Sequence, residues 1–328
     1  MKNMSCILLI GICGLALFAW KYTRNNVNNT NVPRDSSANS KSQLPKTEIE
    51  GAVINLLEEK CDDALYDEVS QHEVVRDDIV QTAPVNVKGD LKSQTIRILP
   101  VRRNNDVSYI VTFPWNKWKD STKVQELKIY DSAWNKVAEV KTKLHLIYEV
   151  ACDLESNSLF ILGRSEREKV EDGEIEILVY SLDSRKVIAH HNIEQARIDD
   201  DIYMVSTTNG IYLFHCTFRD AKIYIKKITE AKVEVIWERA YFRFGIVYPP
   251  KINDAHNIIA FSVENDVNEN YPLWLLDTAT NKVQKAVQSN APLYSNVPYK
   301  WISANRLLFL SQQNQLVDWS LYELILPD

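Results

Sequence analysis

The sequence has little glycine and lacks the groupings of residues that most catalytic motifs require. Only 8 of its 328 residues are glycine, which excludes a glycine-rich phosphate loop. Gly163 and Gly210 stand alone, so neither forms the sharp glycine-flanked turn of a serine nucleophile. No histidine has a second histidine or a cysteine at metal-ligand spacing, and the neighbours His190 and His191 would point to opposite faces of a strand. We therefore predict structural or surface histidines, no catalytic residue, no metal site and no cofactor.

Cysteine and basic residues are also scarce in ways that exclude classes of protein. Two of the five cysteines lie in an apolar N-terminal segment, and the others are Cys61, Cys152 and Cys216. An odd number without close spacing is no disulfide framework, so we expect Cys152 and Cys216 to be buried free thiols. The net charge of −6 argues against a nucleic-acid surface, which would show clustered Lys and Arg.

The N-terminal residues indicate targeting followed by a tether. An apolar run from Met4 to Trp20 lies between Lys2 and Lys21. Residues 1–24 are therefore either a retained signal anchor or a cleaved signal peptide, and Leu17 disfavours cleavage after Ala19. We predict a protein anchored in a membrane with its main domain outside the cytoplasm, either periplasmic or extracellular; cleavage would instead give a secreted protein.

Two further segments precede the main domain. Residues 25–46 are rich in Asn and Ser, which predicts a flexible linker. Residues 47–82 are acidic, and Ile49, Val53, Leu56 and Leu57 fall partly on one side of a helix. We predict a helical segment here, packed against the domain that follows.

What the chain does contain is a repeat. The dipeptide Lys-Val occurs at residues 136, 186, 232 and 282, at intervals of 50, 46 and 50. Upstream of each dipeptide stand two short apolar runs bounded by polar residues, which read as strands buried on both faces. The first runs begin at residues 109, 159, 211, 258 and 307, and the second at 127, 178, 223 and 273.

Each repeat predicts a small antiparallel sheet. The Asp, Asn and Thr residues just before each Lys-Val can bond nearby backbone and hold a hairpin turn. After the turn, Lys136 to Val140 alternates polar and apolar residues, as an outer strand with one wet face should. With room for another strand upstream, the unit has four strands in about fifty residues, the pattern of a β-propeller blade. Residues 83–328 are therefore predicted to be an all-β, five-bladed propeller; a further blade within 47–84 would make six.

The last repeat lacks a partner for its outer position. A fifth Lys-Val would fall beyond Asp328, so the final blade needs a strand from elsewhere. The segment Val85 to Lys88 precedes the first blade and is the predicted donor, paired with residues 318–326. Such an N-terminal strand would remove an exposed sheet edge.

One stretch of the repeat resembles a known superfamily. Residues Ile258 to Asn270 give a strand and an acidic loop, and Pro272 to Asp277 give a strand ending in Asp. This succession resembles the blades of TolB-like and WD-repeat-like propellers. The resemblance covers about residues 85 to 328 and implies the propeller fold; those families include both enzymes and scaffolds.

Aromatic residues in the expected loops suggest where a partner binds. Propeller loops between second and third strands, and those joining blades, emerge on one face, and aromatic residues there are enriched at binding patches. The alternative is that these rings cap the core between blades. The candidate residues are Trp115, Trp118, Tyr241, Phe242, Phe244 and Tyr294.

An acidic loop adds two more candidates. The alternation of Asp266, Asn268 and Asn270 is similar to the start of a calcium loop, but the central Gly and the closing Glu are missing. A solvated turn is the better interpretation. We keep Asp266 and Asn268 as binding residues and predict no metal.

The sequence therefore favours a non-catalytic module that binds a protein or peptide, with the membrane as its second partner. The alternative is a hydrolase of glycans or peptides, with carboxylates around the central channel that sequence spacing does not reveal.

Overall fold

A computed structural model provides the fold. It describes residues 45–70, 81–85, 87–88, 96–103, 106–114, 125–153, 155–165, 175–193, 200–217, 220–241, 248–253, 255, 257–263, 273–288, 298–312 and 319–327. The linker 25–46, apart from residues 45 and 46, lies outside these residues, and so does the apolar segment Met4 to Trp20. Within the described part, no helix is long and apolar enough to cross a membrane.

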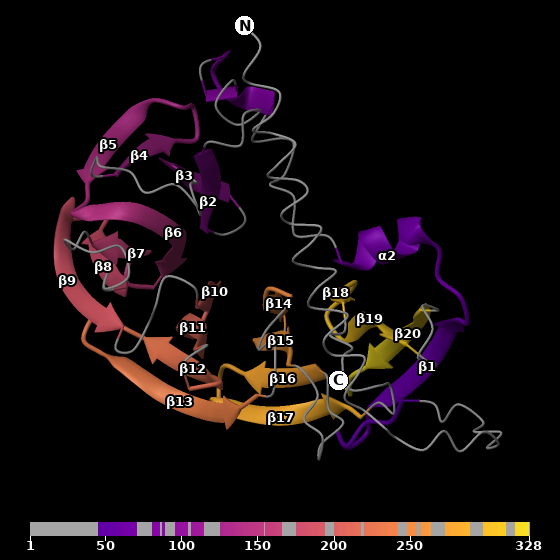
Figure 1. The fold of residues 1–328 in the computed structure, drawn as a ribbon. Helices are drawn as coiled ribbons and strands as arrows, with labels where there is room; N and C mark the ends of the chain where they lie inside the picture. Colours follow the sequence, from indigo (N-terminus) through magenta and orange to yellow (C-terminus); the bar gives the residue numbers. More distant parts are fainter. Residues whose placement is uncertain are drawn as a thin grey trace, which may run out of the picture. The chain divides into compact units, whose positions relative to one another are not determined.

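The described residues form five four-stranded antiparallel sheets (Figure 1). The first contains β2 (Ile96–Arg103), β3 (Asp106–Pro114), β4 (Glu126–Asp131) and β5 (Lys136–Lys141). The second contains β6 (Leu144–Asp153), β7 (Ser158–Ser165), β8 (Ile175–Ser181) and β9 (Lys186–Ile193). The third contains β10 (Asp201–Thr207), β11 (Gly210–Thr217), β12 (Lys222–Ile228) and β13 (Val233–Ala240). The fourth contains β14 (Lys251–Asn253), β15 (Ile258–Ser262), β16 (Leu273–Asp277) and β17 (Lys282–Val287). The fifth contains β18 (Tyr299–Trp301), β19 (Arg306–Gln312), β20 (Trp319–Ile325) and β1 (Val53–Glu58).

The Lys-Val repeat marks the outer strand of four sheets, as predicted. Lys136, Lys186 and Lys282 each open such a strand, and Lys232 directly precedes β13. The turns before them are closed by short side chains: Asp131 Oδ1 accepts hydrogen bonds from the backbone N–H groups of Ala133 and Asn135. This chemistry fixes the point at which the third strand turns into the fourth.

Neighbouring sheets pack face to face through apolar clusters. One cluster joins the first and second sheets, a second joins the second and third, a third joins the third and fourth, and a fourth joins the fourth and fifth. The first strands contact one another in series, from β2 to β6, β10, β14 and β18. Sheets stacked in this way around their first strands are the blades of a β-propeller, which confirms the predicted fold class with five blades.

The fifth blade is completed by an N-terminal strand, although not by the predicted one. Strand β1 pairs antiparallel with β20, from Val53 opposite Ile325 to Glu58 opposite Leu321. The predicted donor around Val85 instead forms a helical turn in which the Lys88 N–H bonds the Pro84 carbonyl at 2.9 Å. The donor prediction is therefore wrong, while the expectation of an N-terminal closing strand is confirmed.

The expected helical segment 47–82 is only partly helical. Helix α2 (Asp63–Ser70) lies within it, but β1 occupies the residues that a helical spacing had suggested. Pairing with β20 outweighs this weak local pattern, because tertiary contacts routinely override propensity. The propeller thus includes residues that we had assigned to a separate segment before residue 83.

The segment after β1 covers faces of the first and last blades. Val69 and Leu65 of α2 pack on Leu310 and Leu321 of the fifth blade. Residues Ala83 and Val87 belong to a cluster on the first blade. Among the described residues, α2 therefore covers a face of the fifth blade, and Ala83 and Val87 cover a face of the first blade.

Candidate functional site

Most of the predicted binding residues lie outside the described residues. Tyr241 is the exception, and it is only 9% exposed. Its hydroxyl donates a hydrogen bond to the Thr217 carbonyl at 3.1 Å, and its ring joins the cluster between the third and fourth blades. Tyr241 thus packs in the core between blades, as the alternative interpretation expected, and its binding role stays a prediction. Those outside are Trp115, Trp118, Phe242, Phe244, Asp266, Asn268 and Tyr294.

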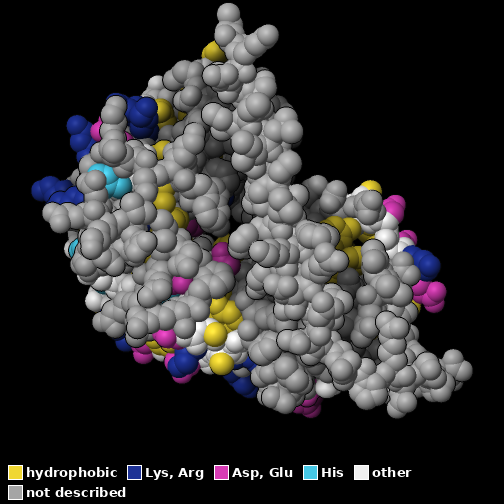
Figure 2. Space-filling view, viewed as in Figure 1, with side chains coloured by type: hydrophobic (Ala, Val, Ile, Leu, Met, Phe, Trp, Pro, Cys, Tyr) yellow, Lys and Arg dark blue, Asp and Glu magenta, His cyan; other side chains and the backbone are white. Residues whose placement is uncertain are grey.

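Surface charge in the described part is mixed. In the view of Figure 2, Lys and Arg side chains stand close to Asp and Glu side chains around the rim, and the described residues there form no broad area of one sign.

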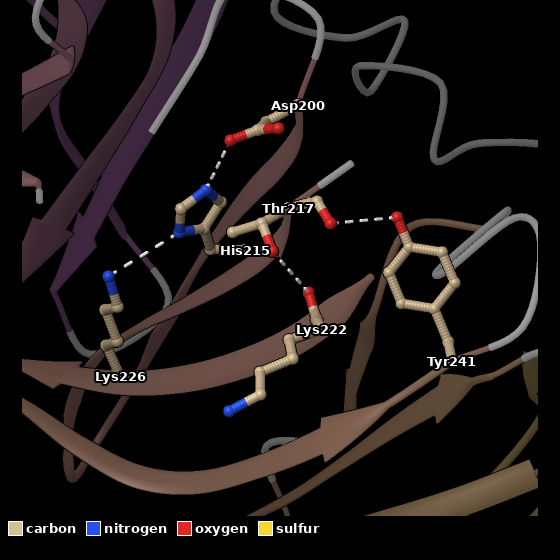
Figure 3. Close-up of polar contacts among 6 residues, drawn as sticks. All are labelled: Asp200, His215, Thr217, Lys222, Lys226 and Tyr241. Carbon is tan, nitrogen blue, oxygen red and sulfur yellow. Dashed lines mark hydrogen bonds and ion pairs between the residues drawn. The ribbon is translucent and has the colours of Figure 1, made fainter. Parts of the chain in front are cut away.

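The most distinctive polar feature is a buried network in the third blade (Figure 3). His215 Nε2 lies 2.8 Å from Asp200 Oδ2, and both side chains are fully buried. On the other side of the ring, His215 Nδ1 lies 3.5 Å from Lys226 Nζ. Lys226 is only 8% exposed. One buried imidazole thus lies between a carboxylate, that of Asp200, and an amino group, that of Lys226.

The hydrogen-bond partners define the state of the ring. An ammonium group only donates and a carboxylate only accepts. The imidazole must therefore carry its proton on Nε2, which donates to Asp200, and must accept from Lys226 at Nδ1. Burial lowers the pKa of His215, the hydrogen bond that the ring donates to Asp200 opposes this shift, and Lys226 lowers the pKa further. The neutral ring is the form that suits both neighbours.

Hairpin register brings these residues together. A tight turn at Thr208 and Asn209 joins β10 to β11 and sets Asp201 opposite Cys216, so that Asp200 falls beside the end of β11. On the other side, β12 sets Tyr224 opposite His215, and their ring centroids are 6.1 Å apart. Lys226 follows Tyr224 by two residues, and its Nζ lies 5.4 Å from the Tyr224 ring centroid.

A second group of bonds at the same end holds the connection between β11 and β12. Thr217 Oγ1 donates to the Lys222 carbonyl at 3.2 Å, and the Tyr241 N–H bonds the Ala221 carbonyl at 2.8 Å. Together with the Asp200, His215 and Lys226 network, these contacts form what we call the blade-three brace. Since the imidazole is fully covered, the brace cannot act on a substrate as it stands; it fixes the strand ends from which a loop departs.

The second blade carries a related group at its corresponding end. Glu176 on β8 is 8% exposed, and its Oε2 lies 2.6 Å from His190 Nε2 on β9. Ser165, the last residue of β7, donates to the other oxygen of the same carboxylate. A further ion pair of 3.1 Å joins Arg97 of β2 to Glu149 of β6, across two blades. Polar bracing therefore recurs where strands approach the loop-bearing end.

Sequence reasoning found part of this arrangement. The prediction of a structural histidine is confirmed for His215, and Cys152 and Cys216 are buried free thiols as expected. The partnership of His215 with Asp200 was missed. The short turn at Thr208 and Asn209 could have revealed it. In a hairpin with this turn, pairing residues outward from Thr207 and Gly210 brings Asp200 close to His215.

Comparisons with known proteins give only distant structural likenesses. No protein-family model matches the chain, and no curated protein matches its sequence. The WD40 domain of Toxoplasma gondii coronin resembles it with a TM-score of 0.45 and 9% identity, over 71% of this chain and 57% of that one. BamB from Moraxella catarrhalis gives a TM-score of 0.37 and 10% identity, over 68% of this chain and 57% of that one. An oligogalacturonate lyase in complex with manganese gives a TM-score of 0.41 and 8% identity, over 68% of this chain and 64% of that one.

These likenesses concern the fold alone. The chain covers less than two thirds of each of the three structures. The propeller architecture itself rests on the strand order and blade packing described above.

Proposed function

We propose that this protein is a membrane-tethered, non-catalytic binding module that holds a protein or peptide at the loop-bearing end of its propeller. The observation that carries the proposal is the unequal length of the connections at the two ends of the blades. Residues 115–125, 166–174, 218–221, 263–272 and 313–318 join second to third strands. At the opposite end, the connections between first and second strands have two to four residues: 104–105, 154–157, 208–209, 254–257 and 302–305. At the loop-bearing end only 218–221 is as short as this.

Long connections on a rigid scaffold are the usual place for recognition, because strands position loops whose sequence is free to vary. The blade-three brace holds both strand ends of the shortest of these connections, 218–221, and so fixes the backbone at this end of the propeller. The two tryptophans of the first connection, Trp115 and Trp118, offer large contact area at low entropic cost. We assign the main binding role to these two residues.

Residues 1–24 complete the proposal. As a retained signal anchor, they would place the propeller outside the cytoplasm, with residues 25–46 as the tether between membrane and propeller. Cleavage would release the same binding module as a secreted protein. Measurement of the intact mass of the purified protein separates these two forms.

Affinity capture from membranes tests the binding role. The full chain and a Trp115→Ala, Trp118→Ala variant serve as baits, and a Val187→Ala, Ile188→Ala variant removes exposed apolar side chains from β9 as a matched control. We expect the tryptophan variant to lose the partners that the other two baits retain, with unfolding curves unchanged. Equal capture by all three baits would refute the surface, and turnover of a glycan or peptide by the purified chain would favour a hydrolase.

A further inference from the structure

Strand β1 gives the fifth blade an outer edge that differs from the other four. It is the last strand of its sheet, and among the described residues no strand pairs with its second edge. In an antiparallel pair, alternate residues direct their N–H and C=O groups away from the partner. The pairing with β20 is regular from Val53 to Leu56 and shifts register before Glu58, so the regular part of β1 presents a row of backbone donors and acceptors about 13 Å long.

Proteins commonly protect such edges with charged residues, Lys above all. The outer strands of the other blades each contain at least one basic residue: Lys136 and Lys141, Lys186, Arg239, and Lys282 and Lys285. Strand β1 contains none, and its exposed side chains are largely apolar. Val53 is 52% exposed, Leu56 36% and Leu57 45%. Among the described residues the edge is thus unpaired, and its exposed side chains combine three apolar residues with Asn55 and Glu58.

The strand is also held in place at both ends. Gly51 adopts φ of +75° just before it and faces Pro327 near the end of the chain. After it, the Cys61 N–H bonds the Trp319 carbonyl at 2.8 Å, and Ser320 Oγ donates to the Glu59 carbonyl at 2.7 Å. A pre-ordered edge lowers the entropic cost of adding another strand.

Charge around the edge is mainly negative. Four exposed glutamates, at positions 48, 50, 58 and 59, lie at or beside its ends, and Lys46 and Lys60 stand just beyond them. The nearby carboxylates also affect Cys61: burial raises the pKa of its thiol most, and the negative charges of Glu58 and Asp62 raise it further. Basic residues near the ends of an added strand would therefore make favourable electrostatic contacts with these glutamates.

We infer that the free edge of β1 is a docking site for an extended peptide segment of another protein, apolar in its middle and carrying Lys or Arg at its ends. The backbone row would pair with the segment, and Val53, Leu56 and Leu57 would contact its apolar side chains, as in other cases of strand addition. This surface is separate from the loop-bearing end, so the inference goes beyond the binding role proposed above.

Charge argues against a second copy of this chain as the occupant. Two β1 strands paired edge to edge in antiparallel fashion would bring the glutamates before one strand close to Glu58 and Glu59 of the other. A parallel pairing would align glutamates with glutamates. Like charges placed opposite each other on neighbouring strands are destabilising.

The test uses the full chain in detergent and labelled synthetic peptides that alternate Val and Thr, with paired Lys at both ends. Fluorescence anisotropy measures binding. We expect the lysine-ended peptide to bind at least about tenfold more tightly than the same peptide with Glu at its ends, a ratio that corresponds to about 1.4 kcal/mol. A peptide with Pro replacing the central Val should not bind, because Pro removes a backbone donor.

Two matched variants locate the site. Val53→Lys with Leu57→Lys adds two charges to β1, and Val187→Lys with Ile188→Lys adds two to β9 at residues of similar exposure, 47% and 46%. The first variant should weaken binding at least about tenfold, and the second should not. Trp115→Ala with Trp118→Ala should leave peptide binding unchanged, which separates this inference from the proposed function.

Hydrogen exchange of the unmutated chain keeps the test decisive should the β1 variant fail to fold. Bound peptide should slow exchange of backbone amides within Val53–Glu58 and leave those of Lys186–Ile193 unchanged. Equal binding of the Lys and Glu peptides, equal loss in both lysine variants, or no slowing in β1 would overturn the inference. Self-association abolished by the β1 variant would overturn it too, by making a second copy the occupant.

Discussion

The buried network of Asp200, His215 and Lys226 allows a quantitative prediction for stability. Asp200→Asn keeps the shape of the side chain but removes its charge. Breaking a buried charge pair by removing one member costs roughly 3–5 kcal/mol. The amide oxygen still accepts from His215, which restores about 1 kcal/mol. We therefore expect Asp200→Asn to lower the free energy of unfolding by about 2–4 kcal/mol, and Lys226→Met to lower it by about 3 kcal/mol.

The double variant carries the sharper expectation. The double variant leaves no charge buried without its counterpart. Its loss of unfolding free energy should therefore be smaller than the sum of the two single losses, by at least about 1–2 kcal/mol. Because His215 separates the two side chains, this coupling would pass through the imidazole. Lys227→Met serves as control, since its ammonium lies 5.6 Å from the Tyr212 ring at a partly exposed position and should cost below about 1 kcal/mol.

Urea unfolding followed by tryptophan fluorescence measures these values, with the slope of free energy against urea as a check on cooperativity. Single losses below about 1 kcal/mol would contradict the assigned burial. Strict additivity in the double variant would show that the two charges do not sense each other, and the network would then be three independent contacts.

Two further predictions concern neighbouring features. His215 has a lowered pKa in the folded chain, so the unfolded chain binds its proton first; stability should fall as pH drops below about 6.5, by up to about 1.4 kcal/mol per pH unit. Urea midpoints between pH 7.5 and 5.5 should fall more steeply for the natural chain than for His215→Gln, and parallel curves would contradict this. Gly163→Ala would place a methyl group 2.4 Å from the Leu146 carbonyl oxygen and should cost about 2–3 kcal/mol. Gly51→Ala, strained only by its positive φ, should cost about 1 kcal/mol, and an equal loss in both variants would refute the assigned crowding.

The repeat made most of the architecture predictable from sequence. Lys136 and Lys282 mark outer strands because each follows a turn in which an Asp side chain, Asp131 or Asp277, accepts from local backbone. Before Lys186 the side chain of Ser181 accepts from the Ser184 N–H instead, and such local chemistry can be read from a single chain. The buried runs were equally clear, since a strand covered on both faces leaves a continuous apolar segment.

The closing strand was harder to predict because its partner is distant in sequence. Val53, Leu56 and Leu57 fit a helical spacing, and only the unpaired edge of β20 decides that they form a strand. The partnership of Asp200 with His215 depended on register in the same way. For Trp115 and Trp118, the binding role stays a prediction.

The pairing of β1 with β20 has a consequence for synthesis of the chain. Strand β1 leaves the ribosome among the first residues of the domain, while β20 is among the last. Until β20 has been synthesised, β1 therefore has no strand to pair with. The glutamates on either side of β1 help to keep its apolar residues from aggregating during this time. The first four blades can fold as they emerge, whereas the fifth matures only after release, so a prematurely terminated product would display an orphan strand that quality-control chaperones and proteases recognise.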